Sequence, residues 1–235
     1  MTSLVCAIHQ PNFFPWLGYF DKIRRADVFI FLDAVDYPRS GSGGMGSWTN
    51  RVKLMAGGQA RWVGCPMKRL PLGAPILAAE IDDSQHWRTK LLKTLEANYR
   101  RAPKYASAMD LLAPLIGRPE VNLAGFNIAA IQAIADQLGV SARFVCQSSL
   151  AWQAQATPML IELVKSVGAQ SYLAGGGAGG YQEDALFAQG GVTLRYQGFV
   201  PRPYGAIEPF TPGLSVIDYL MHDARTLEEA FPDGG

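Results

Sequence analysis

The chain has 235 residues, of which 49% are apolar and 17% are charged, so it can bury a large core and is too apolar for a disordered protein. Its formal net charge is +1, which excludes the strong positive field that favours binding to nucleic acid or to an anionic membrane. The sequence has neither a signal peptide nor an apolar run of the roughly 18 residues that a membrane span needs, so we expect a cytoplasmic protein.

The first part of the chain predicts a strand–helix–strand unit followed by a hairpin. Leu4–Ile8 and Val28–Leu32 are apolar on both faces, which is typical of central parallel strands. Trp16–Arg25 lies between them and has the length of a short helix. The glycine-rich segment Pro38–Ser47 is interpreted as a mobile loop that can act as a lid. The predicted hairpin has the arms Trp48–Leu54 and Ala60–Cys65 and turns at Gly57 and Gly58.

Helices and short strands alternate over the rest of the chain. A helix is predicted to begin near Asp82, where acidic and hydroxyl side chains suit the positive end of the helix dipole. Its core face is formed by Trp87, Leu91, Leu95 and Tyr99, which recur at helical spacing. Other helices are predicted at Ala106–Ile116, Asn122–Leu138, Pro158–Val167 and Ser215–Met221. Other strands are predicted at Leu77–Ile81, Ala142–Cys146, Ser171–Leu173 and Thr193–Tyr196.

This alternation predicts the fold class. We expect residues 1–235 to form a single α/β domain with a mainly parallel, Rossmann-like sheet flanked by helices. The hairpin and the helices that follow it are expected as an insertion between strands of that sheet.

The stretch after the first strand, HQPNFFPWLGYFDK, combines polar side chains, prolines and aromatic rings. One interpretation is a strand-to-helix turn whose aromatic residues fill the core, and we assign Phe13, Phe14 and Phe20 to packing. The other is an active-site loop, because open α/β sheets bind ligands at the carboxyl ends of their strands. His9, Gln10 and Asn12 are the candidates for that role, since buried polar side chains need partners.

Asp33 ends the second predicted strand and is the candidate partner of His9. Neighbouring parallel strands end at the same edge of a sheet, and a carboxylate can orient an imidazole that acts as a general base. Lys22 and Arg51 are then candidates for binding a phosphate or carboxylate of the substrate. Asp33 and Asp36 suit a magnesium ion or, equally, an acidic turn. Three scattered histidines and three widely spaced cysteines predict no zinc site.

A run of glycines, Gly175–Gly180, follows a predicted strand and precedes a predicted helix. Such a run lets backbone amides approach an anion, so it suits a phosphate or carboxylate cradle, with a flexible turn as the alternative. It lacks the spacing and the acidic partner of a dinucleotide-binding motif, which we therefore exclude.

Together, HQPNFFPWLGYFDKI, ADVFIFLDAVDY, SWTNRVKL, YLAGGGAGGY and LSVIDYL resemble the WbqC-like family over nearly the whole chain. The resemblance implies a bacterial protein linked to gene clusters for O-antigen and other surface polysaccharides. It carries over His9, Gln10, Pro11, Phe14, Pro15, Gly18, Tyr19, Lys22, Asp33, Tyr37, Asn50, Arg51, Gly175, Gly177 and Tyr181. The sequence departs from the family pattern at Ala34 and Asp36 and in the glycine-stretched loop before Trp48.

Three functions follow as hypotheses. The first is a transferase acting on an anionic, activated small molecule, such as a nucleotide-linked or amino sugar. The second is a nucleotidyltransferase or ATP-dependent ligase, and the third is a non-catalytic binding protein of a polysaccharide assembly machine. The catalytic candidates are His9 and Asp33. The substrate-binding candidates are Gln10, Asn12, Tyr19, Lys22, Tyr37, Asn50, Arg51, Gly175, Gly176, Gly177 and Tyr181.

Overall fold

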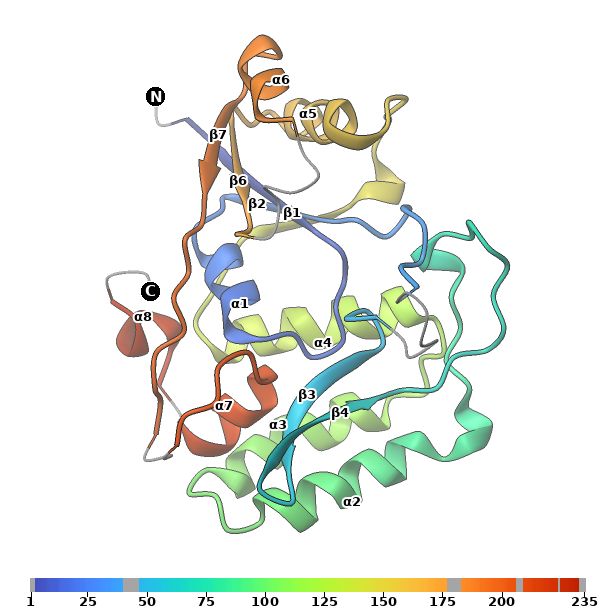
Figure 1. Cartoon of the computed structure of the whole chain (residues 1–235), viewed down its shortest axis with the longest axis vertical. Coiled ribbons are helices and arrows are strands. Elements are labelled where there is room, and N and C mark those ends of the chain that lie inside the picture. Colours follow the sequence, from blue (N-terminus) through green and yellow to red (C-terminus); the bar gives the residue numbers. More distant parts are fainter. Residues whose placement is uncertain (1–2, 40–46, 177–182, 206–208, 224, 233–235) are drawn as a thin grey trace.

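The computed structural model describes residues 3–39, 47–176, 183–205, 209–223 and 225–232. In these ranges, five parallel strands form a sheet in the order β5-β2-β1-β6-β7, which confirms the predicted α/β class (Figure 1). The strands are β1 (Val5–His9), β2 (Val28–Phe31), β5 (Arg143–Cys146), β6 (Ser171–Ala174) and β7 (Thr193–Tyr196). The chain moves from β1 outward to β5 and then returns to β6, so the strand order reverses between β1 and β6.

Helices cover both faces of this sheet because alternate strand residues point to opposite sides. Ala7, Phe29 and Phe31 pack with α1 (Leu17–Arg24) and α4 (Leu123–Gln137). Cys6, Ile8 and Ile30 pack on the other side with α5 (Ala156–Ser166) and α6 (Asp184–Gln189). Figure 1 shows the sheet between these two layers. The strands are therefore apolar on both faces, as central parallel strands require.

The predicted hairpin is confirmed as β3 (Arg51–Ala56) and β4 (Gln59–Gly64), an antiparallel pair outside the main sheet. Gly57 and Gly58 form its turn with φ angles of 60° and 74°, which suit glycine. The hairpin packs on α2 (Trp87–Tyr99) and α7 (Val216–His222), and α7 in turn contacts α3 (Tyr105–Gly117). Trp87, Leu91, Leu95 and Tyr99 are the buried residues of α2, as their spacing predicted.

The strand predicted at Leu77–Ile81 is wrong. Residues Ile76–Ala78 form a short 3-10 helix, and only isolated bridges follow, from Glu80 to Asn122 and from Ile81 to Met67. The amide of Leu77 donates to the carbonyl oxygen of Asp33, so this apolar run wraps around the end of β2 instead of extending.

One helix boundary and one additional helix differ from expectation. Asp82 caps a separate 3-10 turn, Asp83–Gln85, and α2 begins only after His86, whose φ angle is 52°. A short helix near the end of the chain, α8 (Leu227–Ala230), was not predicted, although Thr226 forms a capping box there. The proposed lid lies mostly outside the described residues. Within the described ranges, no helix has the length and apolar character that crossing a membrane requires.

Candidate functional site

Three predicted site residues meet where the strand order reverses, between the carboxyl ends of β1 and β6. His9 is the last residue of β1, and Gly175 follows β6 directly. Lys22 reaches the same place from α1, where its Nζ donates to the carbonyl oxygen of Ile8 at 2.8 Å. A Cβ atom added to Gly175 would lie 3.9 Å from this Nζ. Because such reversals are where open α/β sheets bind ligands, we call His9, Lys22 and Gly175, together with Asn12 of the loop that follows β1, the strand-end site.

Lys22 is a buried cation without a matching anion. Its exposed fraction is 3%, and no carboxylate pairs with it among the described residues. Burial lowers the pKa of its ammonium to about 7. The neighbouring thiol of Cys6 does not supply the missing charge, because burial raises the pKa of Cys6 to about 12. Buried charges are normally paired, so the site is electrostatically incomplete as it stands.

His9 is held in a defined, neutral form. Its Nδ1 lies 3.1 Å from the carbonyl oxygen of Gln10, which also accepts a 2.9 Å hydrogen bond from the hydroxyl of Tyr19. A carbonyl oxygen can only accept, so Nδ1 carries the proton and Nε2 keeps a lone pair. Burial, together with the charge of Lys22, lowers the pKa of His9 to about 3. The Tyr19 ring packs edge-on against the imidazole at 4.8 Å.

Asn12 is a second buried polar side chain left incomplete at this place. It is 7% exposed, and its Oδ1 is buried without a hydrogen-bond partner. Leaving a buried acceptor unpaired costs about 1–3 kcal/mol, so native structures rarely do so outside a site for water or ligand. Gln10 is only partly buried beside it.

The loop that carries Asn12 is fixed by backbone contacts from distant segments. Asn127 of α4 donates its side-chain amide to the carbonyl oxygens of Pro11 and Thr49, at 2.8 and 2.7 Å. Ser215 donates its hydroxyl to the carbonyl oxygen of Phe14, which has a φ angle of 40°. Phe13, Phe14 and Phe20 are at most 1% exposed, so their predicted packing role is confirmed. The loop therefore holds a strained backbone rigidly beside His9.

Comparison with known proteins shows a family to which the chain can be assigned. The model of the WbqC-like protein family matches residues 10–228. The chain belongs to the WbqC-like family. This WbqC-like chain is 27% identical over 221 residues to an uncharacterized protein of Mycobacterium tuberculosis strain H37Rv, Rv1507c, and the alignment covers 92% of each chain. No solved structure matches the chain.

Asp33 has a different partner in the WbqC-like chain from the one we predicted. Its buried carboxylate accepts from the backbone amide of Ser148 at 2.9 Å and from the hydroxyl of Ser148 at 2.5 Å. No hydrogen bond or ion pair joins Asp33 to His9 among the described residues. The strand register explains this result, because His9 pairs with Phe31, two residues before Asp33, and the chain then turns toward β5.

The remaining predicted residues divide into two groups. Tyr37, Asn50 and Arg51 lie around the start of the hairpin, where Asn50 donates to the carbonyl oxygen of Cys65 at 3.1 Å. The guanidinium of Arg51 lies 4.3 Å from the ring centre of Trp62. No hydrogen bond or ion pair joins Tyr37 or Asn50 to His9 or Lys22 among the described residues. Gly176 follows Gly175 at the strand-end site, whereas Gly177 and Tyr181 lie outside the described residues.

Sequence reasoning missed Asn127, which is fully buried and ties the loop after β1 to the segment at Thr49. The available signal was an asparagine on the apolar face of the alanine- and isoleucine-rich helix α4. In the part of the chain that the structure describes, no group of three or more His, Cys, Asp or Glu side chains is placed to hold a metal ion.

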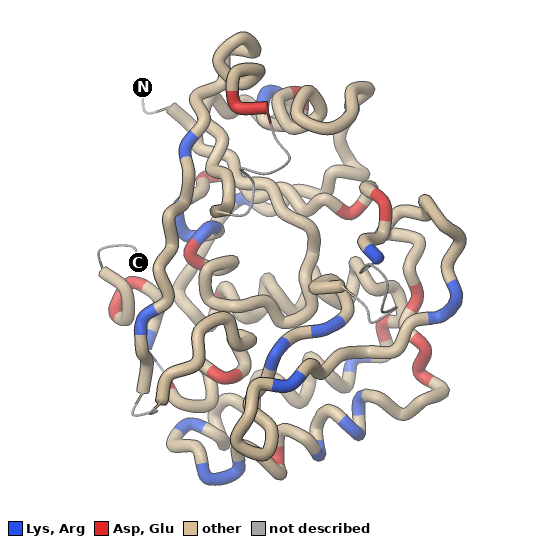
Figure 2. Tube along the Cα trace, viewed as in Figure 1, with Lys and Arg blue, Asp and Glu red and all other residues tan. Residues whose placement is uncertain are grey.

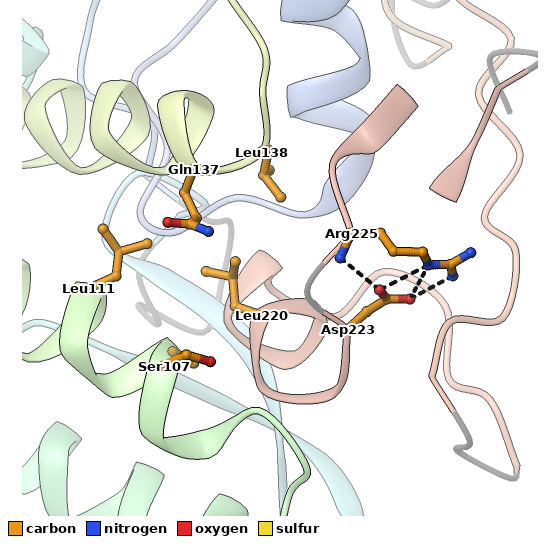
Figure 3. A pocket seen from close by; sticks show the side chains of 8 residues that line it. Ser107, Leu111, Gln137, Leu138, Leu220, Asp223 and Arg225 are labelled. Atoms are coloured by element: carbon orange, nitrogen blue, oxygen red, sulfur yellow. Dashed lines mark hydrogen bonds and ion pairs between the residues drawn. The ribbon is translucent and has the colours of Figure 1, made fainter. Parts of the chain in front are cut away.

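A small pocket lies away from this site, at the contact of α3, α4 and α7 (Figure 3). Its volume is about 30 Å³, which suits roughly one water molecule. Leu111 and Leu220 line it, and the ion pair between Arg225 and Asp223, at 2.6 Å, lies beside it. It is too small for a substrate.

Proposed function

We propose that this WbqC-like protein is a transferase that binds an anionic, activated small molecule at the strand-end site. The observation that carries the proposal is Lys22, a buried ammonium group without an anion among the described residues. A phosphate or carboxylate of the substrate would supply the missing charge. Binding energy is largest for such a site because the charge is already desolvated and held in place before the ligand arrives.

His9 is the proposed general base. Its Nδ1–H is oriented by the carbonyl oxygen of Gln10, which takes the orienting role that we had assigned to Asp33. Its Nε2 is free of a proton at neutral pH because the pKa of His9 is lowered to about 3. A bound anion would offset the charge of Lys22 and raise the basicity of His9, so the base would strengthen only when substrate is present.

The proposed reaction transfers a group from the activated donor to an acceptor. The acceptor's proton goes to Nε2 of His9, a bond forms between the acceptor and the transferred group, and the bond to the donor phosphate breaks. The negative charge left on that phosphate faces Lys22. The side chain of Asn12 would fix the donor's orientation, since its Oδ1 is an unused acceptor.

The substrate class rests on the family. The WbqC-like resemblance favours a nucleotide-linked or amino sugar used in bacterial surface-polysaccharide synthesis. Ser148 does not use all the lone pairs of the Asp33 carboxylate, so Asp33 remains a candidate for contacting the substrate or a metal.

A thermal-shift panel tests the proposal. It compares UDP-N-acetylglucosamine, UDP, inorganic phosphate, acetyl-coenzyme A and ATP with magnesium on the wild-type protein, on Lys22→Met and on Lys165→Met. Lys165 is an exposed lysine of α5 and serves as the matched control. We expect stabilisation by a nucleotide sugar in the wild type and in Lys165→Met, and none in Lys22→Met. Equal stabilisation of Lys22→Met would overturn the anion-binding role, and a response to ATP with magnesium alone would favour nucleotidyl transfer or ligation.

A further inference from the structure

The hairpin has one satisfied edge and one open edge. The amide of Cys65 donates to the carbonyl oxygen of Asn50 at 2.9 Å, so hydrogen-bonded pairs alternate along the hairpin from that point. On β3 several outward groups have partners, since the carbonyl oxygen of Lys53 accepts from the amide of Ser215 and the amide of Met55 donates to Tyr99 Oη. At these positions, the edge of β3 is covered by α2 and by the segment before α7.

On β4, the same alternation points the backbone N–H and C=O groups of Ala60, Trp62 and Gly64 away from β3. None of these groups has a hydrogen-bond partner among the described residues. The residues from Gln59 to Trp62 are exposed, and Trp62 retains 40% of its accessible surface. An unpaired, exposed strand edge is a template on which another extended chain can pair.

A groove runs beside this open edge. It lies between β4 and α2, and its volume is about 390 Å³. Its walls include Val63 and Gly64 from β4 and Trp87, Lys90, Leu91 and Thr94 from α2. Figure 1 shows β4 running alongside α2 over this length. An extended chain on the β4 edge would place every second side chain over the groove.

The charges around the edge indicate the partner's chemistry. Arg61 shares a face of the hairpin with Val63, and Lys53 shares the opposite face with Trp62. Lys90 stands on the groove wall, and no Asp or Glu is among the residues that line the groove. Figure 2 shows basic but no acidic positions along β3 and β4. Each face beside the β4 edge thus carries a cation. A second copy of this chain would bring the same cations together across the edge, which is unfavourable.

We propose that the β4 edge binds an extended, acidic segment of a partner protein, which adds to the hairpin as a third strand. Backbone hydrogen bonds to Ala60, Trp62 and Gly64 would supply affinity, and carboxylates facing Arg61, Lys53 or Lys90 would supply selectivity. This surface is separate from the strand-end site and does not depend on its chemistry.

Fluorescence anisotropy with labelled peptides tests the proposal on the full-length protein. The probe is a peptide of about nine residues in which glutamate and valine alternate, long enough to pair along a strand of ordinary length. If the peptide shifts by one residue along β4, its glutamate face and its valine face exchange places, so one probe samples both arrangements. The comparison peptides replace glutamate with lysine, or carry N-methyl groups that remove every backbone donor.

Two protein variants complete the test. Ala60→Pro removes an outward N–H group, whereas Ala60→Val keeps it and serves as the control. We expect the lysine peptide, the N-methylated peptide and Ala60→Pro each to weaken binding about tenfold or more, with Ala60→Val unchanged. Circular dichroism reports whether Ala60→Pro folds, and the N-methylated peptide tests the same bond on wild-type protein.

Three results would overturn the proposal. One is equal affinity for the N-methylated and unmodified peptides, because pairing along the edge requires those donors. Another is the absence of binding by the glutamate peptide at millimolar concentration. The third is a wild-type dimer in sedimentation velocity that Ala60→Pro converts to monomer, since the occupant would then be a second copy of the chain.

Discussion

Two neighbouring residues of α1 show how differently the fold treats buried charge. Asp21 is 1% exposed and accepts from Arg24 and Arg25, both at 2.9 Å, and from Gln197 at 2.8 Å. Lys22 is 3% exposed and donates to one backbone carbonyl. Asp21, Arg24, Arg25 and Gln197 form the Asp21 cluster, in which the buried carboxylate is paired with cations without any ligand. The strand-end site around Lys22 lacks such a pairing among the described residues, and this difference separates a structural charge from a candidate binding charge.

Asp218 of α7 follows the same rule as Asp21. Its carboxylate is 1% exposed and accepts from the hydroxyl groups of Tyr99 and Tyr204, at 2.8 and 2.7 Å. These bonds join α2, α7 and the segment before α7 into one buried network. The fold is therefore able to satisfy buried carboxylates by side chains distant in sequence. That ability makes the incomplete surroundings of Lys22 and Asn12 more informative.

The sharpest test of this contrast is Asp21→Ala. Removing the carboxylate leaves Arg24, Arg25 and Gln197 without their shared partner, and breaking such a buried pair typically costs about 3 kcal/mol or more. We expect the free energy of unfolding in urea to fall by about 3 kcal/mol. Glu96→Ala, at an exposed position of α2, is the control. A loss no larger than in the control would mean that the Asp21 cluster is not a structural unit.

Lys22→Met should act in the opposite direction on stability. The methionine side chain fills a similar volume and removes an uncompensated buried charge, so we expect the free energy of unfolding at pH 6 to rise by about 2 kcal/mol. This is the trade-off expected of a residue kept for function at a cost in stability. Urea unfolding of the two proteins measures it. A marked destabilisation would place Lys22 with Asp21 as a structural residue.

The pH dependence of that difference follows from the lowered pKa of Lys22. Below about pH 7, Lys22 is charged in both the folded and the unfolded chain, so the fold bears the full cost of the buried charge. Between about 7 and the ordinary value of 10.5, the unfolded chain binds more protons, and wild-type stability therefore rises with pH. The advantage of Lys22→Met should shrink across this window and disappear above it. Urea unfolding at pH 6, 8 and 10 tests the slope, and a constant difference would contradict the shifted pKa.

The fold was largely predictable because its strands are apolar on both faces. Leu4–Ile8 and Val28–Leu32 indicated central strands, and their ends indicated where His9 would lie relative to a second strand end. Contacts between segments far apart were not predictable. Ser148 donates to the carboxylate of Asp33, and it lies 115 residues further along the chain. Nothing local to Asp33 signals that partner.

The residues of the strand-end site could be named as candidates from the sequence, but their burial and their missing partners could not. Lys22 was expected to bind an anion, yet its sequence neighbours Asp21, Arg24 and Arg25 are typical of a solvent-exposed helix face. Only the position of α1 against β1 shows that the ammonium group is buried. The unpaired Oδ1 of Asn12 likewise depends on the fixed loop, which Asn127 holds from another helix.

The smallest expected effect on stability is that of Asn12→Ala, and it is also the most specific. The Oδ1 of Asn12 has no partner in the described structure, so its removal relieves an unpaired buried acceptor and should raise the free energy of unfolding by about 1 kcal/mol. Binding of a nucleotide sugar should weaken about tenfold if this oxygen accepts a hydrogen bond from the ligand. Isothermal titration measures the affinity and urea unfolding the stability. Thr49→Ala is the control. It changes a side chain beside the same loop but keeps the backbone carbonyl of Thr49 that accepts from Asn127, so the affinity should not change. Unchanged binding in Asn12→Ala would mean that a water molecule, and not the substrate, completes this buried group.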